Sequence, residues 1–96
     1  MVYLNCSNVH FGSELDEIYM YKWAREIRGF VKWDKDTLVI RSVRISESSL
    51  RELISLFRRY KIPMQQLAQF ENANNSEWFK NPAMYWYDNI FGSKKE

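Results

Sequence analysis

The sequence is poor in the residues that metal centres and many active sites need. Its 96 residues include one cysteine, one histidine, three glycines and two prolines. A single cysteine excludes an internal disulfide, which favours a reducing, cytoplasmic location. Cys6 and His10 are the only residues of their types, and two such ligands are too few for a tetrahedral zinc site. We therefore predict no metal and no cofactor.

Long apolar runs and glycine-rich loops are also missing. No stretch approaches the roughly 20 apolar residues of a membrane span, and the first residues do not resemble a signal peptide. The three isolated glycines do not form a phosphate-binding loop. The carboxylate pairs Asp16–Glu17 and Asp34–Asp36 are explained by a helix start and a turn. We therefore expect no catalytic residues, no enzymatic activity and no membrane association.

Neither positive nor negative charge is in large excess. Fourteen Lys and Arg against twelve Asp and Glu give a net charge of +2, which does not by itself indicate nucleic-acid binding. The densest basic stretch, residues 41–61, carries six basic and two acidic residues. A solvated helix face is the simpler explanation of this stretch, and a functional role for it stays open.

Aromatic residues, by contrast, are abundant, at 17% of the chain. Six of the sixteen lie in the segment WFKNPAMYWYDNIFG, residues 78–92. Asn81 followed by Pro82 is typical of a helix N-cap with proline at the first helical position, and Gly92 suits a helix end. These signals predict a helix over about 82–91 whose aromatic side chains close a core that a short chain would otherwise leave thin.

Hydrophobic periodicity predicts a single α+β domain over residues 1–92, with a frayed tail at 93–96. Helices are expected at about 14–28 and 47–60, and an antiparallel hairpin at about 30–33 and 38–45, with an N-terminal strand as a further candidate. Short helices are expected at about 63–70, 75–80 and 82–91. The expected core face of the first helix consists of Leu15, Met20, Tyr19, Trp23, Ala24 and Ile27.

Tyrosine, tryptophan and arginine dominate the energetics of protein interfaces. Tyr85, Trp86 and Tyr87 occupy successive helical positions and cannot all face inward, since each position turns by ~100°. Trp86 pairs with Ile90 one turn later, which leaves Tyr85 as the exposed ring. The predicted partner-binding residues are Tyr21, Arg58, Arg59, Asn74, Asn75, Tyr85 and Tyr87. The resulting hypothesis is a non-enzymatic binder of another protein, such as an inhibitor, adaptor or immunity-type protein. Homodimerisation is a second use of the same aromatic residues.

Residues 63–81 offer a different interpretation. The run LAQFENA, with Ala68, Asn72 and Trp78 at the matching positions, resembles part of a helix-turn-helix. That resemblance implies DNA binding, with Asn72 in a left-handed turn conformation. The residues toward the groove would be Asn74, Asn75, Glu77 and Lys80, and those toward phosphates Arg58, Arg59 and Lys61. Glu71 departs from the pattern because an apolar residue belongs there.

Overall fold

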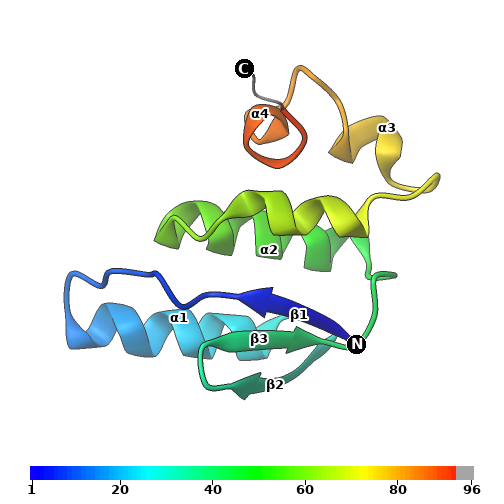
Figure 1. Ribbon diagram of the computed structural model, residues 1–96. Coiled ribbons are helices and arrows are strands. Elements are labelled where there is room, and N and C mark those ends of the chain that lie inside the picture. The colour runs from blue at the N-terminus through cyan, green and yellow to red at the C-terminus, as the bar shows by residue number, and fades with distance from the viewer. Residues whose placement is uncertain (93–96) are drawn as a thin grey trace.

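The computed structural model describes residues 1–92 and contains a three-stranded antiparallel sheet and five helices (Figure 1). The strands are β1 (Val2–Asn5), β2 (Phe30–Asp34) and β3 (Thr37–Ile40). The helices are α1 (Glu14–Glu26), α2 (Glu47–Tyr60), the 3₁₀ helix η1 (Met64–Phe70), α3 (Ser76–Phe79) and α4 (Tyr87–Ile90). The predicted α+β class is confirmed, and the tail predicted at 93–96 lies outside the described residues.

The sheet has the order β1-β3-β2, so the N-terminal strand joins the hairpin and β3 becomes the central strand. Val2 and Phe30 both pair with Ile40, one from each side. The prediction that the second hairpin strand runs on to residue 45 was wrong. β3 ends at Ile40 because neither neighbouring strand extends further to pair with it.

One face of the sheet packs into the core and the other faces outward. Leu4, Leu38 and Ile40 are fully buried on the inner face, while Tyr3 on the outer face is 63% exposed. The free edge of β1 is partly covered by Gln66 of η1. Its side-chain amide accepts from Asn5 N at 2.6 Å and donates to Asn5 O at 2.9 Å, as a neighbouring strand would. This pairing limits the backbone groups that β1 offers to another chain.

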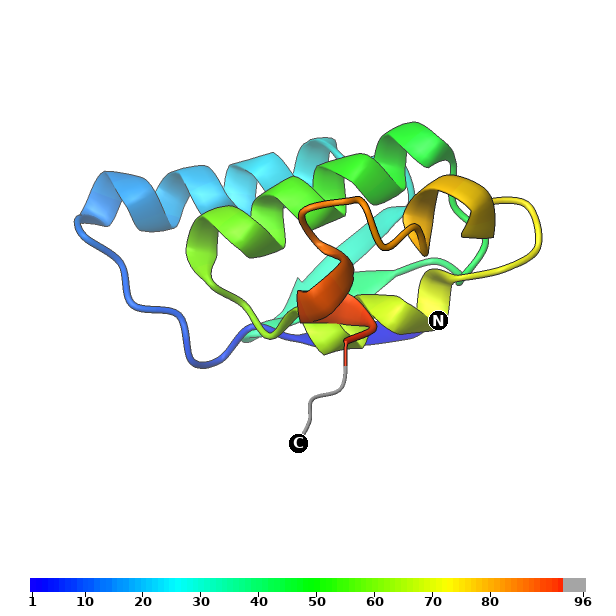
Figure 2. The same ribbon diagram turned by 90° about the horizontal axis from the view of Figure 1, so that it is seen from above.

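The two long helices run in opposite directions beside each other (Figure 2). Ser13 and Ser46 cap their first turns by accepting hydrogen bonds from the backbone N–H groups of Asp16 and Ser49. α2 ends where Lys61 takes a left-handed conformation and Ile62 N donates to Phe57 O. The helix predicted at 47–60 therefore has the bounds that the sequence indicated.

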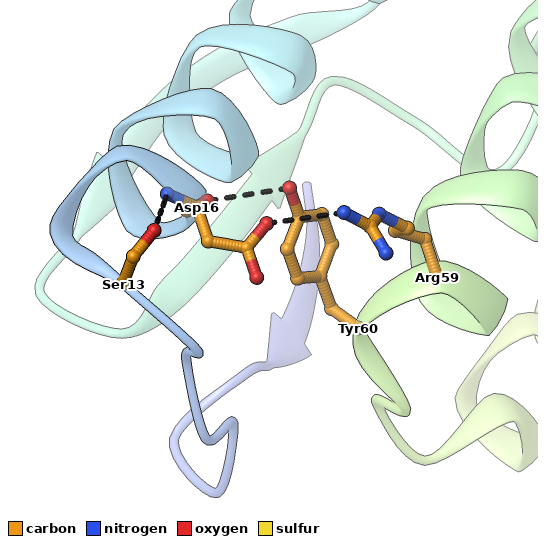
Figure 3. Close-up of polar contacts among 4 residues, drawn as sticks. All are labelled: Ser13, Asp16, Arg59 and Tyr60. Atoms are coloured by element: carbon orange, nitrogen blue, oxygen red, sulfur yellow. Dashed lines mark hydrogen bonds and ion pairs between the residues drawn. The ribbon is translucent and has the colours of Figure 1, made fainter.

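A polar cluster holds the end of α2 against the start of α1 (Figure 3). The Tyr60 hydroxyl donates to Asp16 O at 3.2 Å, and Arg59 Nη2 lies 3.3 Å from the Asp16 carboxylate. Burial, together with the nearby Asp16, raises the pKa of Tyr60 above its ordinary value. The hydroxyl therefore stays protonated and remains a donor at the helix–helix contact.

The buried face of α1 differs from the prediction. Met20, Ala24 and Ile27 are buried as expected, but Leu15 and Tyr19 are 59% and 56% exposed. α1 contacts β2 and α2 through the side that carries Met20 and Ala24. The start of α1 projects beyond the strands in Figure 1, so no sheet lies under its first turns. The proposed inward row was wrong at these two positions because only its later members reach the core.

The C-terminal lid, residues 76–92, packs over α2 and η1 (Figure 1). The helix predicted at 82–91 was wrong in extent, because only Tyr87–Ile90 is helical. Asn81 Oδ1 accepts from Ala83 N at 2.9 Å and Asn81 O from Met84 N at 3.0 Å, which makes a turn. Trp86 is buried and its Nε1 donates to Phe79 O at 2.7 Å. This bond ties Trp86 back onto α3 within the lid and so favours a bent path over a continuous helix.

Candidate functional site

The exposed side of α2 carries two arginines that stack on aromatic rings of the lid. Arg51 lies with its guanidinium carbon 4.3 Å from the ring centre of Trp78 and 5.8 Å from that of Trp86. Arg51 Nε also donates to Glu47 Oε2 at 2.8 Å. We call Arg51, Arg58, Trp78, Tyr85 and Trp86 the arginine–aromatic strip. The strip fixes side chains of two distant segments in one arrangement before any partner arrives.

Tyr85 is the most exposed ring of this strip, at 53%. The Arg58 guanidinium carbon lies 4.5 Å from its ring centre, and the Trp86 ring packs edge-on at 5.0 Å. Trp86 and Ile90 are buried, as the helical spacing predicted. The sequence-based expectation that Tyr85 is exposed agrees with this geometry. A stacked guanidinium loses less freedom on binding than a free one, which suits an interface position.

A cleft of about 470 Å³ opens at the Trp78 end of the strip. It lies between the start of α2, the loop before it and the loop that precedes α3. Its lining residues are Arg44, Ile45, Glu47, Leu50, Asn72, Ala73, Asn74, Asn75 and Trp78. We call it the asparagine cleft. It brings the predicted residues Asn74 and Asn75 next to the arginine–aromatic strip through Trp78, which belongs to both.

The asparagines of this cleft are held by the backbone of their own loop. Asn72 Oδ1 accepts from Asn74 N at 2.8 Å, and Asn75 Nδ2 donates to Phe70 O at 2.8 Å. Asn75 Oδ1 accepts from Asn72 N at 2.9 Å. Asn75 is therefore occupied in shaping the loop, whereas Asn74 is exposed at its tip. Of this predicted pair, Asn74 is the side chain available to a partner.

Tyr21, Arg59 and Tyr87 do not join the strip. The Tyr21 ring packs edge-on against Trp33 at 4.5 Å, and its hydroxyl donates to Asp36 at 3.3 Å. Tyr21, which was predicted as a partner-binding residue, is half-buried because Trp33 of β2 provides a ring for it to pack on. Burial and the neighbouring Asp36 raise its pKa. Arg59 pairs with the start of α1, and Tyr87 is half-buried against Phe91.

The segment that resembles a helix-turn-helix has a different geometry. Its first part, η1, is a 3₁₀ helix, and its second, α3, has four residues. Four helical residues rise only ~6 Å, about one turn. Among the described residues other than glycine, positive φ occurs only at Lys35 and Lys61, so Asn72 does not take the expected left-handed conformation. The segment therefore lacks both the turn and the length of a recognition helix.

Cys6 and His10, the two residues considered as metal ligands, differ in burial. Cys6 is buried and its thiol donates to Leu4 O at 3.8 Å, whereas His10 is exposed. Burial raises the pKa of Cys6 to about 12, so the thiol is not a nucleophile at neutral pH. Within residues 1–92, no group of three or more His, Cys, Asp and Glu could hold a metal ion. The same residues include no helix with the length and apolar character to cross a bilayer.

Two features of the surface were not found from the sequence. Arg51 and Trp78 meet although 27 positions separate them, and no local pattern indicates such a contact. The exposed apolar face of α1, formed by Leu15, Ile18 and Tyr19, was the second. The sequence did contain a signal for this exposed face, because apolar residues occupy every side of α1 and a single buried stripe requires fewer.

Comparison of the chain with protein-family models, curated proteins and solved structures gave no match.

Proposed function

We propose that the chain is a small non-enzymatic domain of the cytoplasm that binds another protein through the arginine–aromatic strip and the asparagine cleft. The observation that carries the proposal is the Arg58–Tyr85 stack, in which the ring and the guanidinium lie 4.5 Å apart while half of Tyr85 is exposed. Tyr and Arg are the residue types most often found at energetic hot spots. In this stack Tyr85 and Arg58 hold each other in place, and the exposed half of Tyr85 remains available to a partner.

The shape and chemistry of this region favour a partner that inserts a loop. The asparagine cleft is concave and offers the exposed amide of Asn74 next to the indole of Trp78. Arg44 adds a cation at its rim, and Glu47 an anion. A loop with an acidic residue and an apolar residue meets complementary groups in this cleft. Covering such a loop is how an inhibitor or immunity-type protein acts, and this is the role we propose.

The test starts from affinity capture by the folded full chain, followed by identification and separate purification of the captured protein. Titration calorimetry then measures its affinity for the wild type and for Tyr85→Ala. Loss of a hot-spot tyrosine is expected to weaken binding by roughly 30-fold or more, since such residues contribute about 2 kcal/mol or more. The captured protein must bind with fixed stoichiometry to count as a partner.

Tyr3→Ala is the matched control, because Tyr3 is a tyrosine of similar exposure on the outer face of the sheet. Its affinity should equal that of the wild type. Equal losses in both variants, or no loss in Tyr85→Ala, would contradict the proposed surface. Binding to duplex DNA that is lost with Arg58→Ala and weakens steeply with salt would instead support nucleic-acid recognition.

A further inference from the structure

The outward side of α1 carries an apolar face that the rest of the described chain leaves uncovered. Leu15, Ile18 and Tyr19 are 59%, 55% and 56% exposed, and their spacing places them together on one side of the helix. The opposite side of α1 is buried through Met20 and Ala24. The exposed residues are therefore not needed for the fold that residues 1–92 adopt.

The net charge along the same helix changes sign from one end to the other. Glu14 and Glu17 are exposed in the first turns, whereas Lys22, Arg25 and Glu26 are exposed in the last ones, where two positive charges and one negative charge leave a net charge of +1. A second copy laid antiparallel on this face places the acidic end of each helix beside the basic end of the other. Such an arrangement is self-complementary about a two-fold axis, as an isologous dimer requires.

We infer that α1 is the interface of a homodimer, in which two copies pack antiparallel through Leu15, Ile18 and Tyr19. A hollow of about 500 Å³ lies along one flank of α1 beside Ile18, and its charged lining residues are Glu17, Lys22, Arg25 and Glu26. This hollow gives side chains of the second copy room beside charges of both signs. The interface is separate from the arginine–aromatic strip, so dimerisation leaves the proposed partner surface free.

The experiment uses two charge-reversed full-length variants and sedimentation velocity. One carries Glu14→Lys with Glu17→Lys and the other Lys22→Glu with Arg25→Glu. The wild type is expected to sediment at twice its monomer mass of 11.7 kDa. Each variant alone meets like charges across the two-fold axis and is expected to be monomeric at the same concentration. An equimolar mixture pairs opposite charges at both ends and is expected to restore the dimer.

Thermal unfolding monitored by circular dichroism establishes that each variant is folded, because the first turn of a helix prefers acidic residues. Ile18→Gln tests the same face without altering its charge, and is expected to raise the dimer dissociation constant tenfold or more. Tyr3→Ala and Tyr85→Ala are expected to leave it unchanged. A monomeric wild type at millimolar concentration overturns the inference, as does a dimer that persists in both charge variants or is lost with Tyr85→Ala.

Discussion

Cys6 shows how a single buried side chain gives the protein a dependence on pH. It directly follows β1, and its backbone N–H donates to Asp36 O at 2.9 Å, which closes the sheet at that end. The thiol is almost fully buried. Burial disfavours the thiolate and raises the pKa of the folded state from the ordinary value of 9.0 to about 12.

The free energy of unfolding is therefore expected to fall as the pH rises above 9. In that range the unfolded chain releases the Cys6 proton and the folded chain keeps it, so ionisation favours the unfolded state. The loss is about 1.4 kcal/mol per pH unit, or about 2 kcal/mol by pH ~10.5. Urea unfolding of the wild type at pH ~8 and pH ~10.5 measures it.

Cys6→Ala is the comparison for this measurement. Tyr21 and Tyr60 also have raised pKa values, and their effect has the same sign in both proteins. Cys6 is the last and smallest of the causes that raise the pKa of Tyr21, so the difference between the two proteins reports mainly Cys6. The alanine variant should lose less stability between the two pH values, and identical losses would rule out a buried neutral thiol.

At the scale of elements, α2 and α1 differ in how completely their sequences specify them. The bounds and inward face of α2 follow from local signals: the apolar spacing of Leu50, Leu53 and Phe57, the Ser46 cap and Pro63 beyond its end. The bounds of α1 were nearly right as well, but its predicted inward face was wrong at Leu15 and Tyr19. Apolar residues surround that helix, and only packing against β2 and α2 selects which of them are buried.

The lid could not be predicted in detail for a similar reason. Asn81 and Pro82 are typical of a helix start and Gly92 of a helix end, yet the continuous helix predicted over 82–91 does not form. The bond from Trp86 Nε1 to Phe79 O and the burial of Trp86 are tertiary contacts, which local signals do not encode. The arginine–aromatic strip depends on the same contacts. The predicted exposure of Tyr85 agrees with the structure although Tyr85 lies in the turn before α4 and not in the helix from which its exposure was predicted.

Trp86→Ala is expected to destabilise the fold by about 3–5 kcal/mol, because it removes a buried ring and leaves a cavity in the lid. It also leaves Phe79 O without its donor. Chemical unfolding at neutral pH measures the change. Tyr85→Ala, the neighbouring exposed aromatic, should cost less than about 1 kcal/mol, a limit set by loss of the Arg58 stack. Comparable costs for the two variants would contradict the assigned burial.

On the scale of the whole molecule, the lid belongs to the same hydrophobic core as the sheet and the long helices. Phe79, Trp86 and Ile90 are buried in one cluster with Leu38, Leu53 and Phe70. The sequence predicted this role, since a chain of this length has little apolar surface to spare. What it could not predict is that the packed lid also supplies half of the candidate binding surface.

A chain truncated after Lys80 is therefore expected not to fold cooperatively. The truncation removes Trp86 and Ile90 and exposes the core side of α2 and η1. Calorimetry should show no unfolding transition for the truncated chain and a single one for the full chain. Full-length Tyr85→Ala serves as the control and should keep its transition. A cooperative transition in the truncated chain would show that the lid is dispensable.

The strand order β1-β3-β2 has a consequence for synthesis on the ribosome. Leu4 pairs with Leu38, so β1 emerges 34 residues before the strand that it joins. At typical elongation rates of about 5–20 residues per second, β1 waits roughly two to seven seconds for its partner. During that interval its apolar residues Val2 and Leu4 are uncovered in the nascent chain. The β2–β3 hairpin, whose strands are separated by two residues, forms first, and β1 then pairs with the free edge of β3.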